Sequence, residues 1–225
     1  SSHHRSFGSP TISTFLKEWG IQMGFLGNGL VVPNGVDTYE FSQPLTADDR
    51  LKSRARYGIP IEAVALVTTS RLSHKNGVDT IIEAMSLLPD EFHLSIAGTG
   101  PDEEKLRHLA SRSAVAHRIN FLGHVNYSDL PSLLKSSDIF VRPSRSEGMG
   151  NSFIEAMCAG IPVIATQVGG LSDFIFDRKL NSEKISTAWA VAPDSPEQIC
   201  RAALEIIEQP LLREETSSNA LKIVN

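Results

Sequence analysis

Residues 63–100 read AVALVTTSRLSHKNGVDTIIEAMSLLPDEFHLSIAGTG and decide the fold class. Residues 63–69 form an apolar run that does not alternate with polar residues, as is typical of a strand buried on both faces. In residues 77–88 the apolar side chains recur at helical spacing, and residues 92–97 form a second apolar run. This strand–helix–strand order predicts one βαβ unit of a parallel sheet.

The same alternation continues to about residue 210. We predict further strands over residues 118–122, 138–142, 162–165 and 188–192, and helices over residues 101–112, 128–136, 151–159, 172–176 and 195–208. The pattern predicts an α/β fold: a doubly wound, Rossmann-like parallel sheet from about residue 60 to residue 210. Ligands of such sheets bind at the carboxyl ends of the strands. We therefore expect functional residues in the loops after Thr69, Ala97, Leu122, Arg142 and Ala165.

The ends of the chain carry weaker signals. Ser9 is expected to cap a helix whose first turn holds Pro10. Residues 30–32 predict a short strand and residues 48–57 a helix. Ser195 and Gln198 have the spacing of a capping box, which predicts the start of the last helix.

Composition and missing motifs argue against several classes of protein. The 225 residues carry a formal net charge of -5, whereas nucleic-acid binders usually present a basic face. The two cysteines do not form a CxxC pair, which argues against a disulfide framework and fits a reducing compartment. His74 and His124 have no companions at ligand spacing, so we expect no metal site. The P-loop pattern GxxxxGK[ST] and the hydrolase pattern GxSxG are both absent.

Two of the predicted loops hold charges that could bind a phosphate-bearing ligand. Arg71 and Lys75 lie four residues apart and could clamp a diphosphate, or they could be ordinary solvated cations. Glycines and two acids, Glu147 and Glu155, surround the start of the helix predicted at residue 151. Bare N–H groups at such a helix start can approach an anion, although the acids could also be simple partners of the helix dipole.

Read together, these loops resemble a known family. Glu147 and Glu155, with seven residues between them, are similar to the E-x7-E motif of the retaining GT-B glycosyltransferases of family 4, also called glycosyl transferases group 1. Residues 31–37, VVPNGVD, resemble the interdomain signature of that family, and Arg71 with Lys75 resembles its diphosphate clamp. Further signatures follow in family order over residues 96–101, 121–125 and 155–163.

The resemblance implies a set of roles. It implies that Glu147, Arg71 and Lys75 are catalytic. Donor-binding roles are implied for Glu155, Gly148, Met149, Gly150, Asn151, Gly98, Gly100, Leu122, Gly123, His124, Val125, Gly169 and Gly170. Many relatives have an aromatic residue at the position of Met149 and an aliphatic one at that of Asn151, so which sugar the pocket fits stays open. No metal and no cofactor are implied, since the nucleotide-diphosphate sugar is itself the substrate. The reaction implied is hexosyl transfer to a glycan, lipid or small-molecule acceptor.

The resemblance also implies a division of the chain. Residues 1–35 would be the end of a missing acceptor domain with the interdomain linker, and residues 36–225 the donor-binding domain. The chain would stop before the family's final helix and be inactive alone, because the missing N-terminal domain binds the acceptor. The full-length protein would be cytoplasmic, with peripheral attachment to the inner membrane face left open. Two other functions remain open: a non-catalytic nucleotide-sugar-binding subunit of a split transferase, and another GT-B enzyme such as an epimerase or phosphorylase.

Overall fold

The computed structural model describes residues 10–24, 30–32 and 35–224. Their centre is a six-stranded sheet whose strands pair in parallel throughout. In spatial order the strands are β5 (Ile119–Gly123), β4 (Phe92–Ala97), β3 (Val64–Thr69), β6 (Ile139–Arg142), β7 (Val163–Ala165) and β8 (Trp189–Ala190). The strand order reverses between β3 and β6, which is where doubly wound sheets bind ligands. The predicted doubly wound α/β fold is confirmed.

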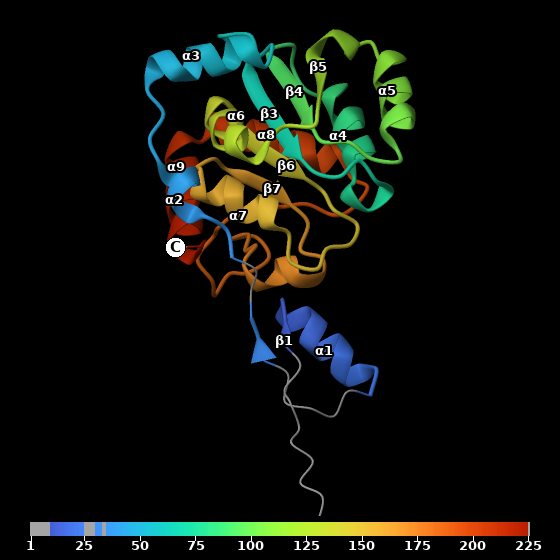
Figure 1. Ribbon diagram of the computed structural model, residues 1–225, viewed down its shortest axis with the longest axis vertical. Helices are drawn as coiled ribbons and strands as arrows, with labels where there is room; N and C mark the ends of the chain where they lie inside the picture. Colours follow the sequence, from blue (N-terminus) through green and yellow to red (C-terminus); the bar gives the residue numbers. More distant parts are fainter. Residues whose placement is uncertain (1–9, 25–29, 33–34, 225) are drawn as a thin grey trace, which may run out of the picture.

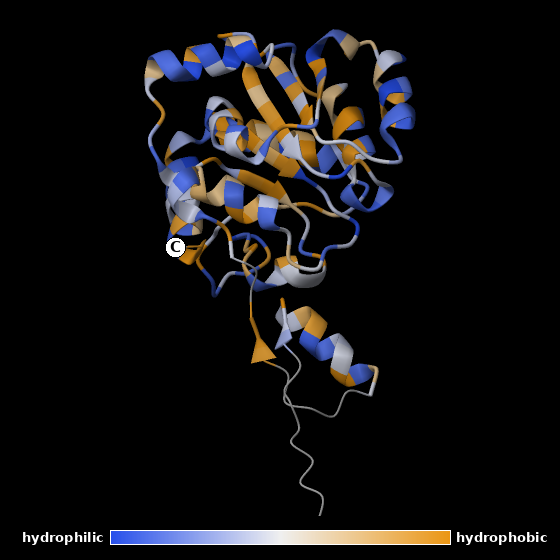
Figure 2. Ribbon diagram, in the orientation of Figure 1, coloured by the Kyte–Doolittle hydropathy of each residue, from blue (hydrophilic) through white to orange (hydrophobic). Residues whose placement is uncertain are grey.

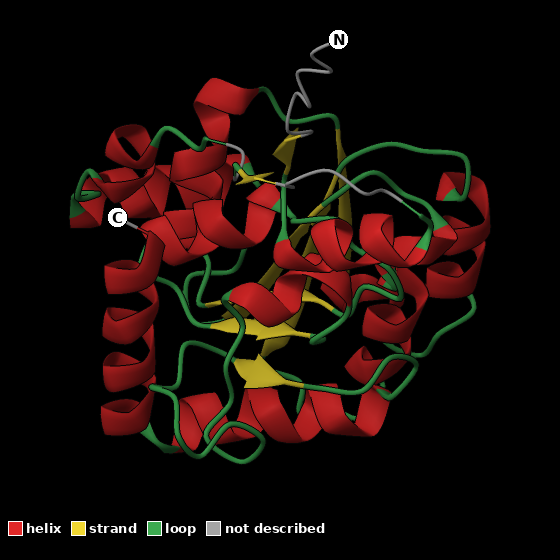
Figure 3. Cartoon of the chain, turned by 90° about the horizontal axis from the view of Figure 1, so that it is seen from below, coloured by secondary structure: helices red, strands yellow, loops and turns green. Residues whose placement is uncertain are grey.

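Helices cover both faces of this sheet (Figures 1 and 3). One face packs against α4 (Val78–Met85), α5 (Glu103–Ser111) and α8 (Pro196–Glu208). The other face packs against α2 (Thr38–Ser42), α6 (Leu130–Ser136), α7 (Asn151–Cys158) and α9 (Pro210–Val224). Helix α3 (Ala47–Arg56) lies against α6. Within β3, Leu66 points into the first core while Ala65 and Val67 point into the second. The strands are mostly apolar in Figure 2, because helices cover both faces of the sheet.

Short 3-10 segments connect several of these elements. They are η1 (His74–Asn76), η2 (Ala116–Arg118), η3 (Tyr127–Asp129) and η4 (Gly169–Asp173). The helix predicted over residues 172–176 is therefore wrong: the structure has η4 in its place. Helices α2 and α9 were not predicted from the sequence. The predicted capping box is also wrong, because the Gln198 side chain accepts a hydrogen bond from the Ala192 N–H at 2.8 Å and Ser195 makes no side-chain cap.

An N-terminal segment lies beside the loop end of the main sheet, at the bottom of Figure 1. It contains α1 (Thr14–Gln22) and a two-stranded parallel pair, β1 (Pro10–Thr11) with β2 (Leu30–Val31). The prediction of a helix beginning at Pro10 is wrong, since Pro10 pairs with Leu30; Ser9 lies outside the described residues. The cap is Ser13, whose hydroxyl accepts from the Leu16 N–H at 3.3 Å. The Thr14 N–H donates to Asp173 at 2.8 Å and joins this segment to η4.

Candidate functional site

A cavity of about 900 Å³ opens at the carboxyl ends of β3, β4 and β6, at the point where the strand order reverses. Its wall comes from the loops after these strands and after β5, from α6 and the first turns of α7, and from Ile12 of the N-terminal segment. The volume lies in the range that holds a drug-sized or nucleotide-sized ligand. The fold thus gathers into one cavity loops that are far apart in the sequence.

The structure brings most of the candidate residues to this cavity. The four charged candidates, Arg71, Lys75, Glu147 and Glu155, all line it. So do eight of the remaining candidates: Gly98, Gly100, His124, Val125, Gly148, Met149, Gly150 and Asn151. The two cations come from the segment after β3, whereas Glu147 lies in the loop before α7 and Glu155 lies within α7. Both signs of charge therefore line the same open cavity.

The other four candidates do not line the cavity. Leu122 and Gly123 end β5, where the Gly123 carbonyl accepts a hydrogen bond from the Gly98 N–H at 2.7 Å. Gly170 donates its N–H to the Glu147 carbonyl at 3.1 Å. A Cβ on Gly169 would lie 2.0 Å from that same carbonyl oxygen. Gly169 and Gly170 therefore lie outside the wall of this cavity, because their backbone packs behind the Glu147 loop, and their donor-binding role stays a prediction.

Gly98 has a similar packing reason in the loop after β4. Its φ is +138°, and an added Cβ would lie 1.8 Å from the Ser70 carbonyl oxygen. This close approach joins the loops after β3 and β4, and the Leu72 N–H donates to the Thr99 carbonyl at 2.9 Å. The glycine thus allows the loop that carries Arg71 to turn along the rim of the cavity.

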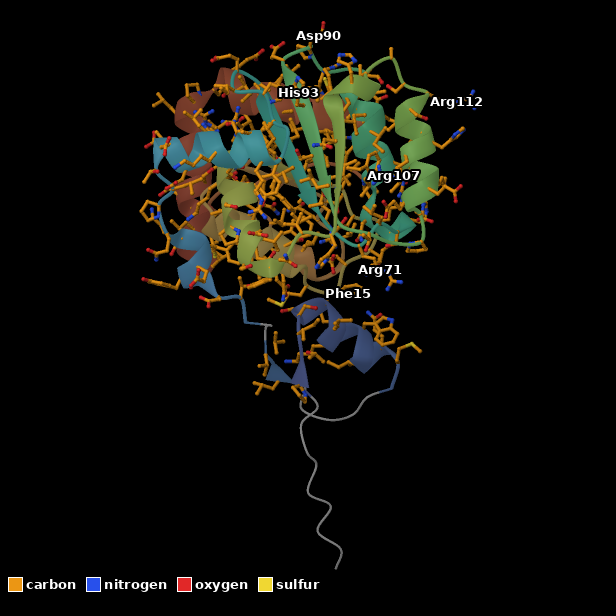
Figure 4. The ribbon with its side chains drawn as sticks, turned by 45° about the horizontal axis from the view of Figure 1, so that its top comes forward. Phe15, Arg71, Asp90, His93, Arg107 and Arg112 are labelled. Carbon is orange, nitrogen blue, oxygen red and sulfur yellow. The ribbon has the colours of Figure 1, made fainter. Side chains whose placement is uncertain are left out.

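The cations at the rim have no partner of opposite charge. Among the residues that the structure describes, no carboxylate lies within ion-pair distance of Arg71 or Lys75. Both residues are exposed, and Figure 4 shows Arg71 at the edge of the main body, near α1. The backbone that carries them is tied down, since the Asn76 side chain donates to the Arg71 carbonyl at 2.6 Å. Two positive charges with no counter-ion among the described residues can accept an anionic ligand.

The carboxylate side contains a residue that the sequence analysis did not assign. Arg142, the last residue of β6, donates to the Glu147 carboxylate, to Ser152 Oγ at 2.6 Å and to Asn76 Oδ1 at 3.0 Å. Burial lowers the pKa of Arg142, and the charges of Glu147 and Glu155 raise it. An arginine ending an otherwise apolar strand was the available signal for this role. Arg142 thereby connects the β3 loop, the Glu147 loop and α7.

Glu155, unlike Glu147, has no hydrogen-bond donor among the described residues. Its residue is 7% exposed, and within the described part of the chain no group donates a hydrogen bond to its carboxylate. Burial raises the pKa of Glu155, and the nearby Arg142 charge lowers it. A buried carboxylate that borders a cavity and lacks protein donors can accept hydrogen bonds from ligand hydroxyls.

The start of α7 also faces the cavity. Its N-cap is Gly150 at φ 79°, which makes no side-chain cap, and Gly150, Asn151 and Ser152 all line the wall. The first N–H groups of a helix have no partner within the helix and carry partial positive charge. They are suited to polar or anionic parts of a ligand.

No group of three or more His, Cys, Asp and Glu that could hold a metal ion occurs among residues 10–24, 30–32 and 35–224. Over the same residues, no helix has the length and apolar character that crossing a membrane requires. The expectations of no metal and no cofactor remain predictions.

Comparison with known proteins identifies the family. Residues 49–223 match the family model described as glycosyl transferases group 1. The chain belongs to this family. It is 31% identical over 196 residues, 86% of its length, to an uncharacterized glycosyltransferase of Methanocaldococcus jannaschii. It is 30% identical over 193 residues to the GDP-mannose-dependent monoacylated alpha-(1-6)-phosphatidylinositol monomannoside mannosyltransferase of Corynebacterium glutamicum.

Solved glycosyltransferase structures share its fold. The crystal structure of Anabaena HepE in complex with UDP and glucose superposes with a TM-score of 0.85 at 22% identity, covering 96% of this chain and 57% of that one. The C-terminal domain of a glycosyl transferase group 1 family protein, LpcC, from Francisella tularensis gives a TM-score of 0.71 at 24% identity, covering 84% of this chain and 96% of that domain. The chain spans about half the length of the full-length relatives that it matches, namely 48% of both the Methanocaldococcus and the Corynebacterium protein.

Proposed function

We propose that this chain is the donor-binding half of a retaining glycosyltransferase that transfers a hexosyl group from a nucleotide-diphosphate sugar without a metal ion. The supporting observation is that Arg71, Lys75, Glu147 and Glu155 line one cavity. A nucleotide-sugar donor is in keeping with the Corynebacterium relative, which is named as GDP-mannose-dependent, and with HepE, a protein of the same fold that was crystallised with UDP and glucose. The base and the sugar of this chain's own donor are left to experiment.

In this proposal Arg71 and Lys75 bind the diphosphate. When the bond between the anomeric carbon and the diphosphate oxygen breaks, negative charge builds on the leaving nucleotide, and the two cations stabilise it. The acceptor hydroxyl attacks the same face of the sugar, its proton passes to the departing diphosphate, and the new glycosidic bond keeps the anomeric configuration. Fixed cations stabilise the leaving group in place of a divalent ion.

The two carboxylates bind the hydroxyl groups of the donor. Glu155, deep in the cavity, accepts hydrogen bonds from the ribose hydroxyls. Glu147 contacts the sugar hydroxyls near the reacting carbon, and the N–H groups at the start of α7 help hold the sugar. In this proposal the acceptor binds to a separate N-terminal domain, and residues 1–35 are the end of that domain and the interdomain linker. A glycan, lipid or small molecule fits that role, and the Corynebacterium relative is named for a lipid-linked acceptor. The assignment of the full-length protein to the cytoplasm or its membrane face belongs to the same proposal.

Thermal shift with a panel of UDP-, GDP- and ADP-sugars tests the donor proposal. We expect one nucleotide series to raise the melting temperature as its concentration exceeds the Kd. Arg71→Ala and Lys75→Ala should each weaken that stabilisation, and Lys52→Ala, a cation of the exposed face of α3, serves as control. No stabilisation by any of the panel, or equal stabilisation of all four proteins, contradicts the proposal. Steady sugar transfer by the 225-residue chain alone would contradict its expected inactivity.

A further inference from the structure

Arg145, three residues after β6, makes the densest set of charged contacts near the cavity without lining it. Its guanidinium donates to both carboxylate oxygens of Asp79, at 2.9 and 3.0 Å, and its Nε donates to Asp194 at 2.7 Å. The Arg145 side chain is 17% exposed. A two-pronged contact with Asp79 and a second carboxylate at Nε fix the plane of the guanidinium.

The same arginine holds the short turn that carries Lys75. Its backbone N–H donates to the Lys75 carbonyl at 2.7 Å, and its guanidinium donates to the carbonyl of His74. Both carbonyls belong to η1, the 3-10 turn after β3. The Lys75 ammonium has no ion-pair partner within the described residues, so the direction of its side chain depends on where this turn is held.

The two acids that hold Arg145 come from distant elements. Asp79 lies in the first turn of α4, and Asp194 lies in the loop before α8. Asp194 has a φ of 56°, a left-handed conformation that an aspartate adopts at a cost. Its ion pair with Arg145 gives a physical reason for that conformation. The contacts therefore form a brace from α4 and the α8 loop, through Arg145, to the Lys75 turn.

We propose that Arg145 is a positioning residue that holds Lys75 at the diphosphate subsite of the cavity. The inference rests on the proposed function, because it takes Lys75 to bind the donor diphosphate. Arg145 does not touch the ligand; it sets the backbone from which Lys75 reaches it. Lysine at this position would keep the charge but lose the planar fork, so it would replace Arg145 only in part.

Calorimetric titration of this chain with a nucleoside diphosphate and with the matching nucleoside separates this role from a general effect on folding. The base is the one preferred in the thermal-shift panel. Arg145→Ala should lower the affinity for the diphosphate by about 10-fold, the value of one charge-assisted contact, and leave the affinity for the nucleoside unchanged. Arg145→Lys should recover part of the loss. Arg178→Ala is the matched control, because Arg178 pairs with Glu205 at 2.7 Å and lies outside the cavity wall.

A double-mutant cycle with Lys75→Ala decides whether Arg145 acts through Lys75. We expect Arg145→Ala to cost nothing further in the Lys75→Ala background. Equal losses for diphosphate and nucleoside, or losses that add in the cycle, overturn the inference. If Arg145→Ala does not fold, Asp79→Asn loosens the same brace and should show the same selective loss of diphosphate affinity. If Lys75→Ala binds the diphosphate as tightly as the unmodified chain, the diphosphate clamp in the proposed function is wrong. If Lys75→Ala lowers the diphosphate affinity and Arg145→Ala does not, only the inference about Arg145 is wrong.

Discussion

Arg142 donates a hydrogen bond to the Glu147 carboxylate, and the two side chains are only 9% and 10% exposed. The guanidinium also lies over the ring of Phe153, 5.0 Å from its centroid. The Glu147 carboxylate has a second donor in the N–H of Gly148 at 3.0 Å. A buried pair of this kind fixes the direction of a carboxylate at the wall of the cavity, and removing one partner leaves an uncompensated charge.

Arg142→Met should therefore destabilise the chain by about 3 kcal/mol in urea denaturation, because Glu147 would remain buried without its counter-charge. The double variant Arg142→Met with Glu147→Gln should lose less, since the remaining charge is removed as well. Equal stabilities for the single and double variants would show that the Arg142–Glu147 pair is not what the single variant disrupts.

Glu155 should give the chain a pH-dependent stability. Its raised pKa means that the folded chain keeps the proton at pH values where the unfolded chain has lost it. The stability contributed by this carboxyl is thus fully present below the unfolded pKa and is lost as the pH rises through the raised one. The free energy of unfolding of Glu155→Gln, relative to that of the unmodified chain, should therefore increase as the pH rises from the unfolded pKa to the raised one. Above the raised pKa this difference should stay constant.

The same substitution should weaken the binding of the nucleotide. If Glu155 binds the ribose as a carboxylate, Glu155→Gln should lower nucleotide affinity by about 10-fold at neutral pH. The affinity of the unmodified chain should also fall on acidification through the raised pKa. Unchanged affinity in the glutamine variant, measured by titration calorimetry, would remove Glu155 from the donor site.

Gly98→Ala should destabilise the chain by at least about 2 kcal/mol, since the new Cβ would lie 1.8 Å from the Ser70 carbonyl oxygen at a positive φ. Gly35→Ala is the matched control, because a Cβ there meets nothing within 4 Å and its φ is not in the left-handed range. Thermal or urea unfolding of both variants measures the difference. Similar stabilities would mean that the loops after β3 and β4 can separate without cost.

Asp138 should be a stability residue far from the cavity. It accepts hydrogen bonds from Arg50 at 2.6 Å, from Arg54 at 2.7 Å and from the Ala65 N–H at 2.8 Å. The Arg54 side chain is 4% exposed, so Asp138→Ala leaves a buried cation and should cost about 3 kcal/mol. Asp48→Ala breaks only the exposed pair with Lys52 and should change the stability little. Nucleotide affinity, measured on the folded protein, should stay the same in both variants.

The sequence by itself determined the order of strands and helices and the loops where charged and glycine residues gather. Those features are local: an apolar run, a helical spacing or a glycine pair is visible within about ten residues. The strand at Phe92–Ala97 was predicted to the residue, and the resemblance to the E-x7-E motif singled out Glu147 and Glu155. The same local pattern placed the cap of the first helix at Ser9, because the pairing of Pro10 with Leu30 joins residues too far apart for a local pattern to predict.

Only the tertiary structure decided which groups meet. Arg142 and Asn76 are 66 residues apart, yet their side chains are hydrogen-bonded at 3.0 Å. Gly170 does not line the cavity but donates its N–H to the Glu147 carbonyl behind the wall. The partner of a buried charge is chosen by the crossing of strands and by the need to satisfy each polar group away from water, and neither is a property of a sequence window. That is why the loops could be predicted from the sequence, while the contacts of Arg142 and Arg145 could not.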